Sequence, residues 1–322
     1  MKALVTGASG YIGTTLVRGL KEAGTQVVGL SSKDADLRDP TSLDRFGSDC
    51  FDRIFHLAAW TQAGDFCLHH LGEQWLINQQ INTTVLGFWQ QHQPQAKLIS
   101  MGTSCAYEEG SDLAEDKYLV GTPIADLYTY AMTKRMLVVG QQSIQKQFGL
   151  TWLTLVPSTV YGPGYHIGTK QMHFIFDLAW KVLAYRYHGD PIVLWGDGYQ
   201  RRELVFIEDF ITIMMRLDQE VSNDIVNIGA GEDHSIREFA GLLCELLNVD
   251  PSIIQYDTDR YVGARTKFLS VKHLDRLLPQ RPRTPLREGL LQTLRWLEPK
   301  FREMNSSRRL EKIDAQSSGL GL

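Results

Sequence analysis

The sequence predicts an α/β protein built around a doubly wound parallel sheet, with a smaller C-terminal α/β domain. A short apolar run, Lys2–Thr6, leads directly into glycines spaced Gly-x-x-Gly-x-x-Gly and then into a helical pattern that continues to about Ala23. Apolar strand candidates then alternate with helical patterns at intervals of roughly 25–40 residues, which is typical of parallel sheets with crossover helices. From about Gly164 onward helical stretches alternate with shorter strands, and we assign that part to the second domain.

Composition argues against several classes of protein. The chain has 322 residues, of which 43% are hydrophobic and 22% charged, and this is ordinary for a globular protein with a sizeable core. A net charge of −4 without a basic run argues against a nucleic-acid partner. Four cysteines without paired spacing indicate a reducing compartment. No apolar run is long enough for a signal peptide or a membrane span, so we expect a cytoplasmic protein without a membrane partner.

One short cluster has the residue types of a metal site. Cys67 lies close to His69 and His70 in the chain, but no distant pair of ligands accompanies them. Such a cluster is more often a coincidence than a metal site. We therefore predict no metal site.

The strand candidates of the first domain are short and apolar. After Lys2–Thr6 they are Gln26–Leu30, Arg53–Ala59, Lys97–Met101 and Trp152–Val156. Long helical patterns, one of them containing Asn78 and one over Leu127–Phe148, separate the later strands. This order predicts a Rossmann-type domain over residues 1–163, to which residues 204–230 return. Residues 164–302 then form mainly a substrate-binding domain, and the polar, aperiodic residues 303–322 a flexible tail.

The glycine spacing after the first strand predicts a dinucleotide site. Small residues let the backbone approach a pyrophosphate, and the N-terminus of the following helix offers N–H groups and the positive end of its dipole. A site for NAD usually places an acidic side chain near the end of the second strand, where it binds the ribose 2′-hydroxyl. Here Ser31, Ser32 and Lys33 follow that strand, which favours NADP(H), while the nearby Asp34 keeps NAD(H) open.

Further candidates for cofactor contacts lie in the glycine loop and beyond the carboxyl ends of the predicted strands. Asp36 and Leu37 fit a loop that contacts adenine, although a solvated turn before Pro40 explains them nearly as well. The candidate set for the cofactor is Gly7, Ser9, Gly10, Tyr11, Ile12, Gly13, Ser31, Ser32, Lys33, Asp36, Leu37, Ala58, Ala59, Asn78, Lys134, Pro157 and Val160.

Tyr130 and Lys134 are four residues apart in the helical pattern over Leu127–Phe148. Residues at this spacing share one face of a helix, so the phenol and the ammonium point the same way. A neighbouring cation favours the phenolate, and Tyr130 could then exchange a proton near neutral pH. A surface tyrosine and lysine at helical spacing is the alternative, because so short a pattern is common.

Together these motifs resemble a known family. The glycine triplet, Thr103 four residues before Tyr107, Tyr130-x-x-x-Lys134 and Tyr161-Gly162-Pro163 are similar to those of the extended short-chain dehydrogenase/reductase family, which includes NAD-dependent epimerases and dehydratases. The resemblance implies that Tyr130 is the catalytic acid and base, that Lys134 binds ribose and lowers the pKa of Tyr130, and that Thr103 holds the substrate oxygen. It also implies a homodimer, and the segments Trp75–Trp89 and Leu127–Phe148 carry apolar residues on more than one face.

Within that family the sequence is most similar to the GDP-L-fucose synthases. The stretch from Thr103 to Tyr107 resembles their Ser-Ser-Cys-Ile-Tyr, whereas dehydratases carry Asp and Glu at the positions of Ser104 and Cys105. The resemblance implies a catalytic pair, Cys105 and His173, that removes and returns a proton on opposite faces of a sugar. It implies substrate contacts for Lys181, Trp195 and Arg202. Thr159 and Lys267 complete the candidate set for the substrate, with Lys181, Arg202 and Lys267 as the groups that could meet the nucleotide phosphates.

Each member of this pair has a simpler explanation. A single cysteine after a strand is usually a small buried hydrophobe, and a single histidine before a helix is often a cap.

The synthases have Asn at the position of Thr159, and their nucleotide-binding Arg and Asp fall on Ile253 and Val262 here. Guanine recognition is therefore not implied.

The sequence thus predicts an NADP(H)-dependent nucleotide-sugar oxidoreductase, an epimerase/reductase of a nucleotide 4-keto-deoxy sugar. A nucleotide-sugar 4-epimerase, or a 3,5-epimerase that retains NAD(P), is the alternative among enzymes. An alternative of another class is a cofactor-sensing binding protein without turnover. Thr103, Tyr130 and Lys134 argue against a sensor, because a sensor has no need of all three.

Overall fold

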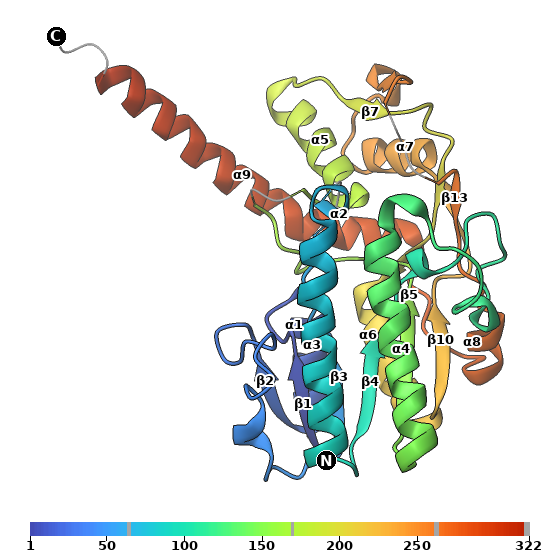
Figure 1. Cartoon of the computed structure of the whole chain (residues 1–322). Helices are drawn as coiled ribbons and strands as arrows, with labels where there is room; N and C mark the ends of the chain where they lie inside the picture. Colours follow the sequence, from blue (N-terminus) through green and yellow to red (C-terminus); the bar gives the residue numbers. More distant parts are fainter. Residues whose placement is uncertain (63–65, 169–170, 261–263, 319–322) are drawn as a thin grey trace.

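The computed structural model describes residues 1–62, 66–168, 171–260 and 264–318, of which residues 306–318 are described by their backbone only. Its main element is a six-stranded parallel sheet (Figure 1). From one edge to the other its strands are β10 (Asp224–Ile228), β5 (Trp152–Pro157), β4 (Lys97–Met101), β3 (Arg53–His56), β1 (Lys2–Thr6) and β2 (Gln26–Leu30).

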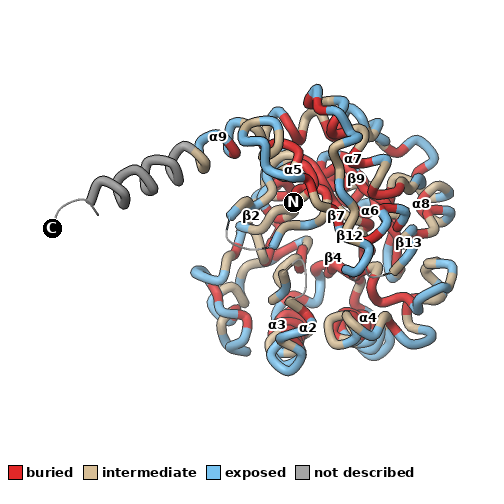
Figure 2. The backbone as a smooth tube through the Cα atoms, turned by 90° about the horizontal axis from the view of Figure 1, so that it is seen from above, coloured by how far each residue is buried: buried red, intermediate tan, exposed pale blue. Residues whose placement is uncertain are grey.

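The sheet is buried on both faces, which explains why its strands are continuous apolar runs. Alternate residues of a strand point to opposite faces, and in β1 Leu4 packs into one core cluster while Ala3 and Val5 pack into another. Figure 2 shows the buried backbone gathered around these strands and the inner sides of the helices. The predicted doubly wound α/β fold is confirmed.

Two pairs of helices cover the two faces. On one side α3 (Leu71–His92) packs against α4 (Tyr128–Phe148), and on the other α1 (Tyr11–Glu22) packs against α6 (Ile207–Glu220). Among the helices that the structure describes, none is both long and apolar enough to cross a membrane.

The strand order reverses direction beside β1. The chain leaves β1 toward β2 on one side and then returns to place β3 on the other side. Ligands of open α/β sheets bind at such a switch point, beyond the carboxyl ends of the strands. Here that position lies between the loop after β1 and the loop after β3.

The C-terminal part has its own core cluster, formed by helices and short strands (Figure 1). Its main helices are α5 (Phe174–His188), α7 (Ile236–Leu246) and α9 (Leu286–Ser318). The short sheets are β6 (Thr159–Tyr161) with β9 (Leu204–Phe206), β7 (Val193–Trp195) with β12 (Gln255–Asp257), and β8 (Arg201–Arg202) between β11 (His234–Ser235) and β13 (Thr266–Lys267). A short helix, α8 (Lys272–Leu277), lies against β10.

The segment from β9 to β10 returns to the six-stranded sheet, since α6 covers one face and β10 forms an edge. The domain boundaries remain a prediction. Helix α9 continues to Ser318, past residue 303, at which the sequence predicts a flexible tail. The flexibility of this end also remains a prediction.

The third strand is shorter than the sequence predicts. It ends at His56 instead of Ala59, because the chain turns under the glycine loop after that residue. The backbone N–H of Ala58 donates to the Thr6 hydroxyl (3.3 Å), and the side chain of Asn78 holds the backbone of Trp60 from both sides (2.9 and 3.0 Å).

Candidate active site

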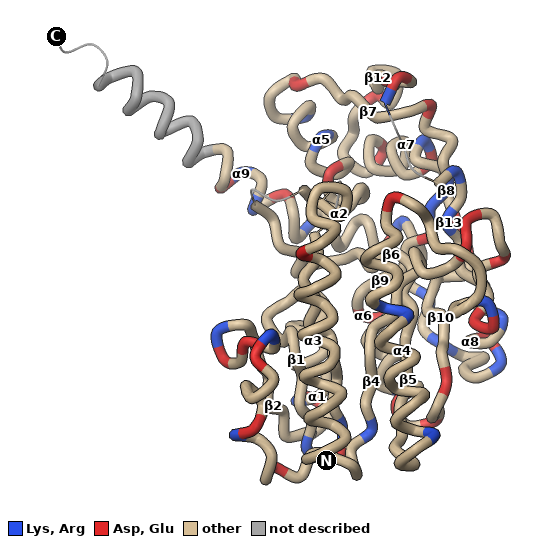
Figure 3. Tube along the Cα trace, viewed as in Figure 1, with Lys and Arg blue, Asp and Glu red and all other residues tan. Residues whose placement is uncertain are grey.

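A cluster of reactive side chains forms where four segments meet beyond the end of β4. Cys105 lies in the short 3-10 helix η2 (Ser104–Ala106), and Thr103 precedes it. Tyr130 is in the first turn of α4. Lys267 of β13 lies beside Arg202 of β8 in a parallel pair, and Figure 3 shows the basic residues of these two strands together.

Thr103 contacts both sides of the site, Tyr130 on α4 and the loop that carries Cys105. Its side chain shares a hydrogen bond with the phenol of Tyr130, and its hydroxyl oxygen also accepts from the backbone N–H of Cys105 (3.3 Å). The backbone N–H of Thr103 donates to the hydroxyl of Tyr118 (3.2 Å). The Thr103 side chain is therefore fixed between the thiol loop and α4.

The thiol of Cys105 lies 2.8 Å from the ammonium of Lys267. Burial raises the pKa of this thiol, but the positive charge of Lys267 and its hydrogen bond outweigh burial, with help from Thr103, so that the net pKa is lowered. A thiolate is the basic and nucleophilic form of cysteine. The simpler explanation of Cys105 as a packing residue does not account for an ammonium brought to it from 162 residues away.

The environment of Tyr130 differs from the expectation based on helical spacing. The sequence predicts that Lys134 lowers the pKa of this phenol. In the structure burial raises that pKa, and the nearby Cys105, Tyr118 and Cys67 raise it further. The hydrogen bond with Thr103 acts in the opposite direction but is the smaller effect. Tyr130 is thus a protonated hydroxyl that can donate to an oxygen.

Lys134 is a buried ammonium on α4, 5% exposed. Burial lowers its pKa to about 8, and among the described residues no carboxylate pairs with it. Its charge acts on His56 at the end of β3, whose pKa burial and Lys134 together lower to about 4. A buried cation without an anionic partner is costly unless polar groups approach it, and ribose hydroxyls are such groups.

His173 is the residue before α5, and its ring lies against that of Tyr165, with the ring centroids 6.1 Å apart. Its backbone N–H donates to the hydroxyl of Tyr165 (3.1 Å), and its side chain does not cap the helix. Although the residue is exposed, surrounding protein and the charge of Lys267 lower the pKa of its imidazole. Lys267 thus interacts by charge with His173 and by a hydrogen bond with the Cys105 thiol. That His173 belongs to the catalytic site remains a prediction.

The glycine loop has the geometry of a close backbone turn. Gly7 has φ of +70°, and a Cβ there would come within 2.8 Å of the Ala58 nitrogen. A Cβ on Gly13 would lie 2.1 Å from the Gly7 carbonyl oxygen. Helix α1 begins after Gly10 without a side-chain cap, so its first N–H groups face the loop. These residues fit a dinucleotide pyrophosphate.

Several predicted cofactor residues make contacts within the protein. Asp34 accepts hydrogen bonds from the N–H (2.8 Å) and hydroxyl (2.6 Å) of Ser31, and Asp36 is paired with Arg38. The phenol of Tyr11 donates to the Gly162 carbonyl (3.1 Å). The remaining candidates occupy varied surroundings: Leu37 and Val160 are buried, Ser32 and Lys33 exposed, and Ser9, Ile12, Ala59 and Pro157 intermediate or exposed.

Three predicted substrate residues are not joined to the thiol by any contact among the described residues. Lys181 pairs with Asp177 one turn back on α5 (2.9 Å). Trp195 is 53% exposed, with the guanidinium of Arg260 over its ring. Thr159 lies in β6 beside Leu204. Val262 lies outside the described residues.

The sequence analysis missed two residues that shape the site. Tyr118 is fully buried and binds the backbone of Thr103. Arg135, beside Lys134 on α4, is buried and donates to the carbonyls of Ala106 (2.9 Å) and Gly121 (2.7 Å), so it holds the thiol loop against the helix. An arginine within an apolar helical face was the available signal. Within the described residues no group of three metal-binding side chains is present.

This combination of fold and site agrees with comparison to known proteins. The model of the NAD dependent epimerase/dehydratase family matches residues 3–229. The chain belongs to this family. It is therefore an NAD(P)-dependent enzyme with a Rossmann-like fold, and its relatives include epimerases and reductases of nucleotide sugars.

Curated relatives share about a quarter of their residues with this chain. A dTDP-4-dehydro-6-deoxy-D-allose reductase of a Streptomyces species is 27% identical over 317 residues, covering 91% of this chain and 95% of that protein. A GDP-L-fucose synthase of Azorhizobium caulinodans is 26% identical over 293 residues, covering 87% and 92%.

Solved structures share the fold of this family member. A GDP-L-fucose synthetase from Naegleria fowleri has a TM-score of 0.84 at 22% identity, covering 94% of each chain. A UDP-glucose 4-epimerase from Thermotoga maritima has a TM-score of 0.81 at 22% identity, covering 93% of this chain and 99% of that one.

Proposed function

We propose that this protein is an NADP(H)-dependent enzyme that epimerises and reduces a nucleotide 4-keto-deoxy sugar. The observation that carries the proposal is the Cys105 thiol, held 2.8 Å from the Lys267 ammonium beside Thr103 and Tyr130. A plain ketone reductase needs the two hydroxyls but has no use for an activated thiol. An epimerase needs a base next to the carbonyl.

The first part of the proposed reaction moves a proton on a carbon that flanks C4. The hydroxyls of Thr103 and Tyr130 donate to the C4 oxygen, and this stabilises the enolate that forms when the flanking C–H bond breaks. Cys105 accepts that proton as a thiolate. His173, after taking a proton from solvent, gives it as the imidazolium to the same carbon from the opposite face, and the centre is inverted.

The second part reduces the ketone. NADPH, when bound, supplies a hydride to C4. Tyr130 gives its proton to the C4 oxygen, so a ketone becomes an alcohol. The glycine loop from Gly7 to Gly13 would hold the pyrophosphate, and Lys134 the ribose next to the nicotinamide.

We propose NADP(H) over NAD(H) because of the groups that follow β2. The Asp34 carboxylate is engaged by Ser31, while Ser32 and Lys33 are exposed and free to meet a 2′-phosphate. One charge-assisted contact is worth about tenfold in affinity or more. Titration of the protein with NADPH and with NADH tests this, and equal dissociation constants would contradict it.

We also propose substrate contacts and assembly. In this proposal Arg202 and Lys267 meet the phosphates of a nucleotide sugar, and Lys181, Trp195 and Thr159 are further substrate contacts. Exposed apolar residues on α3 and α4, among them Leu76, Met136 and Val139, fit a homodimer interface. A monomeric mass by light scattering at micromolar concentration would contradict the dimer.

A plain 4-ketoreductase is the second candidate, because one relative is named a dTDP-4-dehydro-6-deoxy-D-allose reductase. Turnover of nucleotide 4-keto sugars with NADPH in heavy water separates the two. The epimerase/reductase places solvent deuterium at C3 or C5 of the product, whereas the plain reductase leaves both carbons unlabelled.

Two cysteine variants make this test specific. Cys105→Ser replaces the thiol by a much weaker base, so deuterium incorporation should fall by about a hundredfold while NADPH binding persists. Cys244→Ser is the matched control: this buried thiol lies in the C-terminal core, where burial raises its pKa to about 11, and its loss should not change incorporation. Wild-type product without deuterium at C3 and C5 would sink the epimerase proposal.

A further inference from the structure

The carboxyl group of Glu203 ties together two chain segments next to the thiol site. Its residue is 2% exposed. One carboxylate oxygen accepts the backbone N–H of Gly231 (2.8 Å), and the other accepts the backbone N–H of Leu269 (3.1 Å). Both segments are distant in sequence, so this single side chain fixes their relative position.

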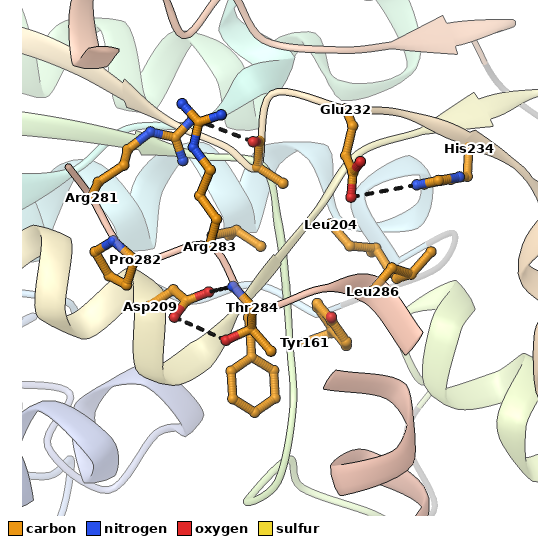
Figure 4. A pocket seen from close by; sticks show the side chains of 13 residues that line it. Tyr161, Leu204, Asp209, Glu232, His234, Arg281, Pro282, Arg283, Thr284 and Leu286 are labelled. Atoms are coloured by element: carbon orange, nitrogen blue, oxygen red, sulfur yellow. Dashed lines mark hydrogen bonds and ion pairs between the residues drawn. The ribbon is translucent and has the colours of Figure 1, made fainter. Parts of the chain in front are cut away.

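The surroundings of Glu203 are shaped to hold a carboxylate. A Cβ on Gly229 would lie 2.2 Å from one of its oxygens, so only glycine leaves room there. Arg281, buried among the residues in Figure 4, donates to the Gly229 carbonyl (2.8 Å). The charge of Arg281 also acts on Glu203. The Glu203 carboxylate is thus surrounded by four residues: Gly229, Gly231, Leu269 and Arg281.

Leu269 is the link from the Glu203 carboxylate to the thiol. It lies two residues past Lys267 and outside β13, whose ladder with β8 is only two residues long, and it forms an isolated bridge with Leu113. Glu203 directly follows Arg202, the residue opposite Lys267. The Glu203 side chain therefore holds the Lys267 segment against β8 just beyond the last backbone pair of the ladder.

We propose that Glu203 is a positioning residue that holds Lys267 against Cys105 and so keeps the thiol ready to accept a proton. The role of the thiol as a base rests on the proposed function; the positioning itself does not. If Glu203 only stabilised the fold, its loss would weaken the protein without a specific effect on Cys105.

The test measures the reactivity of Cys105 directly, in the full chain and without substrate. Iodoacetamide alkylation is followed by peptide-resolved mass spectrometry from pH 6 to 9.5, which separates Cys105 from the other cysteines. Lys267→Met should slow alkylation at pH 7 about tenfold, because the thiolate loses its cation. Glu203→Gln keeps the length of the side chain but only one acceptor oxygen, and at pH 8, where the wild-type carboxyl group is charged, it should slow alkylation about threefold. Both should move the pH profile upward.

The double variant decides whether Glu203 acts through Lys267. If it does, Glu203→Gln should add nothing to Lys267→Met, and the double variant should match Lys267→Met alone. Independent effects that multiply to about thirtyfold would overturn the proposal. Unchanged alkylation in Glu203→Gln would also overturn it.

Asp209→Asn is the matched control for a general loss of packing. Asp209 is another buried carboxylate that accepts a backbone N–H, that of Thr284 (2.6 Å; Figure 4), but its segment does not carry Lys267. This variant should lose stability and keep the alkylation profile of the wild type; a slowed profile would count against the proposal.

Glu203→Asp, which retracts the carboxylate by one methylene, serves as the second variant if Glu203→Gln does not fold, and should slow alkylation likewise. The alkylation experiment needs no turnover, so its result does not depend on whether deuterium is incorporated. Failure of the proposed epimerase function and failure of the Glu203 proposal can therefore be told apart.

Discussion

The two lysines of the site are held in different ways. Lys134 is carried by α4, a helix of 21 residues that packs along α3 and ends at Gly149 in the left-handed conformation. Lys267 is carried by β13, a strand of two residues. The first lysine is fixed by the packing of a whole helix, and the second by a short ladder, the side chain of Glu203 and a bridge between Leu269 and Leu113.

This difference separates robust from adjustable parts of the site. Many apolar contacts hold α4, for example those of Leu137 and Val138 in the core, so the loss of one polar group should leave the helix in place. The Lys267 segment is held by the short ladder with β8, by Glu203 and by a bridge between Leu269 and Leu113, and a short segment of this kind opens locally at lower cost than a packed helix. We therefore expect chemical defects without structural loss on the α4 side, and coupled chemical and structural defects on the β13 side.

The largest expected effect comes from the α4 side. Tyr130→Phe removes the hydroxyl that donates to the C4 oxygen, so turnover with NADPH should fall by about 10²- to 10⁴-fold. Folding should change little, since the phenol loses only its hydrogen bond with Thr103, worth about 1 kcal/mol. Steady-state kinetics and urea unfolding measure the two quantities.

Tyr128→Phe is the control for this comparison. Tyr128 lies in the same first turn of α4 and is 46% exposed, so its hydroxyl should matter for neither turnover nor stability. Loss of turnover in Tyr128→Phe equal to that in Tyr130→Phe would show that the whole turn, and not the phenol of Tyr130, is responsible.

The α4 side of the site is also the part that sequence predicts well. Tyr130 and Lys134 share a helix, and local spacing alone places both on one face. The glycine loop is similarly local, because residues 7–10 lie between β1 and α1 and Gly13 is in the first turn of α1. What spacing could not provide was burial: the pKa of Tyr130 is raised by the protein around it, whereas the isolated pair suggests the opposite direction.

The β13 side could be predicted only in part. The sequence indicated that Lys267 faces phosphates, but its contact with Cys105 joins residues 162 positions apart, and no periodic pattern encodes such a contact. Glu203 was visible only as the neighbour of Arg202. Its role depends on the fold of two distant turns, and the fit of Gly229 around the carboxylate appears once those turns are in place.

The second expected effect is a pH dependence of stability on the β13 side. Burial raises the pKa of Glu203 from 4.5 to about 7, against the opposing effects of the Gly231 and Leu269 amides and Arg281; Asp233 raises it slightly. The folded protein then binds more protons than the unfolded chain between these two values, so the contribution of Glu203 to stability falls as pH rises through this window. Above pH 7 the loss is on the order of 3 kcal/mol relative to pH 4.

Comparison with Glu203→Gln isolates this contribution, because all other groups titrate alike in both proteins. The free energy of unfolding of wild type minus that of the variant should decrease from pH 4.5 to 7 and then stay constant.

Glu238→Gln provides a control of opposite sign. Hydrogen bonds from Ser235 lower the pKa of Glu238, so the free energy of unfolding of wild type minus that of Glu238→Gln should rise with pH. A flat profile for Glu203 would show that its carboxyl group titrates normally. Above pH 7 the charged Glu203 carboxylate, which binds the Leu269 amide, therefore lowers the stability of the fold. This is the same pH range in which Cys105 must act as a thiolate.

The smallest expected effect is a local one, and it compares the two regions within a single molecule. In Glu203→Gln the Leu269 amide loses its carboxylate acceptor, which should lower the free energy of local opening by about 1 kcal/mol. Hydrogen exchange of peptides covering residues 264–270 should then be about fivefold faster than in wild type, while exchange in α4 stays the same. Mass spectrometry at a pH above 7, where the wild-type carboxylate is charged, measures both segments in one experiment. Equal acceleration in both segments would show that Glu203 supports the whole fold, and unchanged exchange in 264–270 would show that the Lys267 segment is held without Glu203.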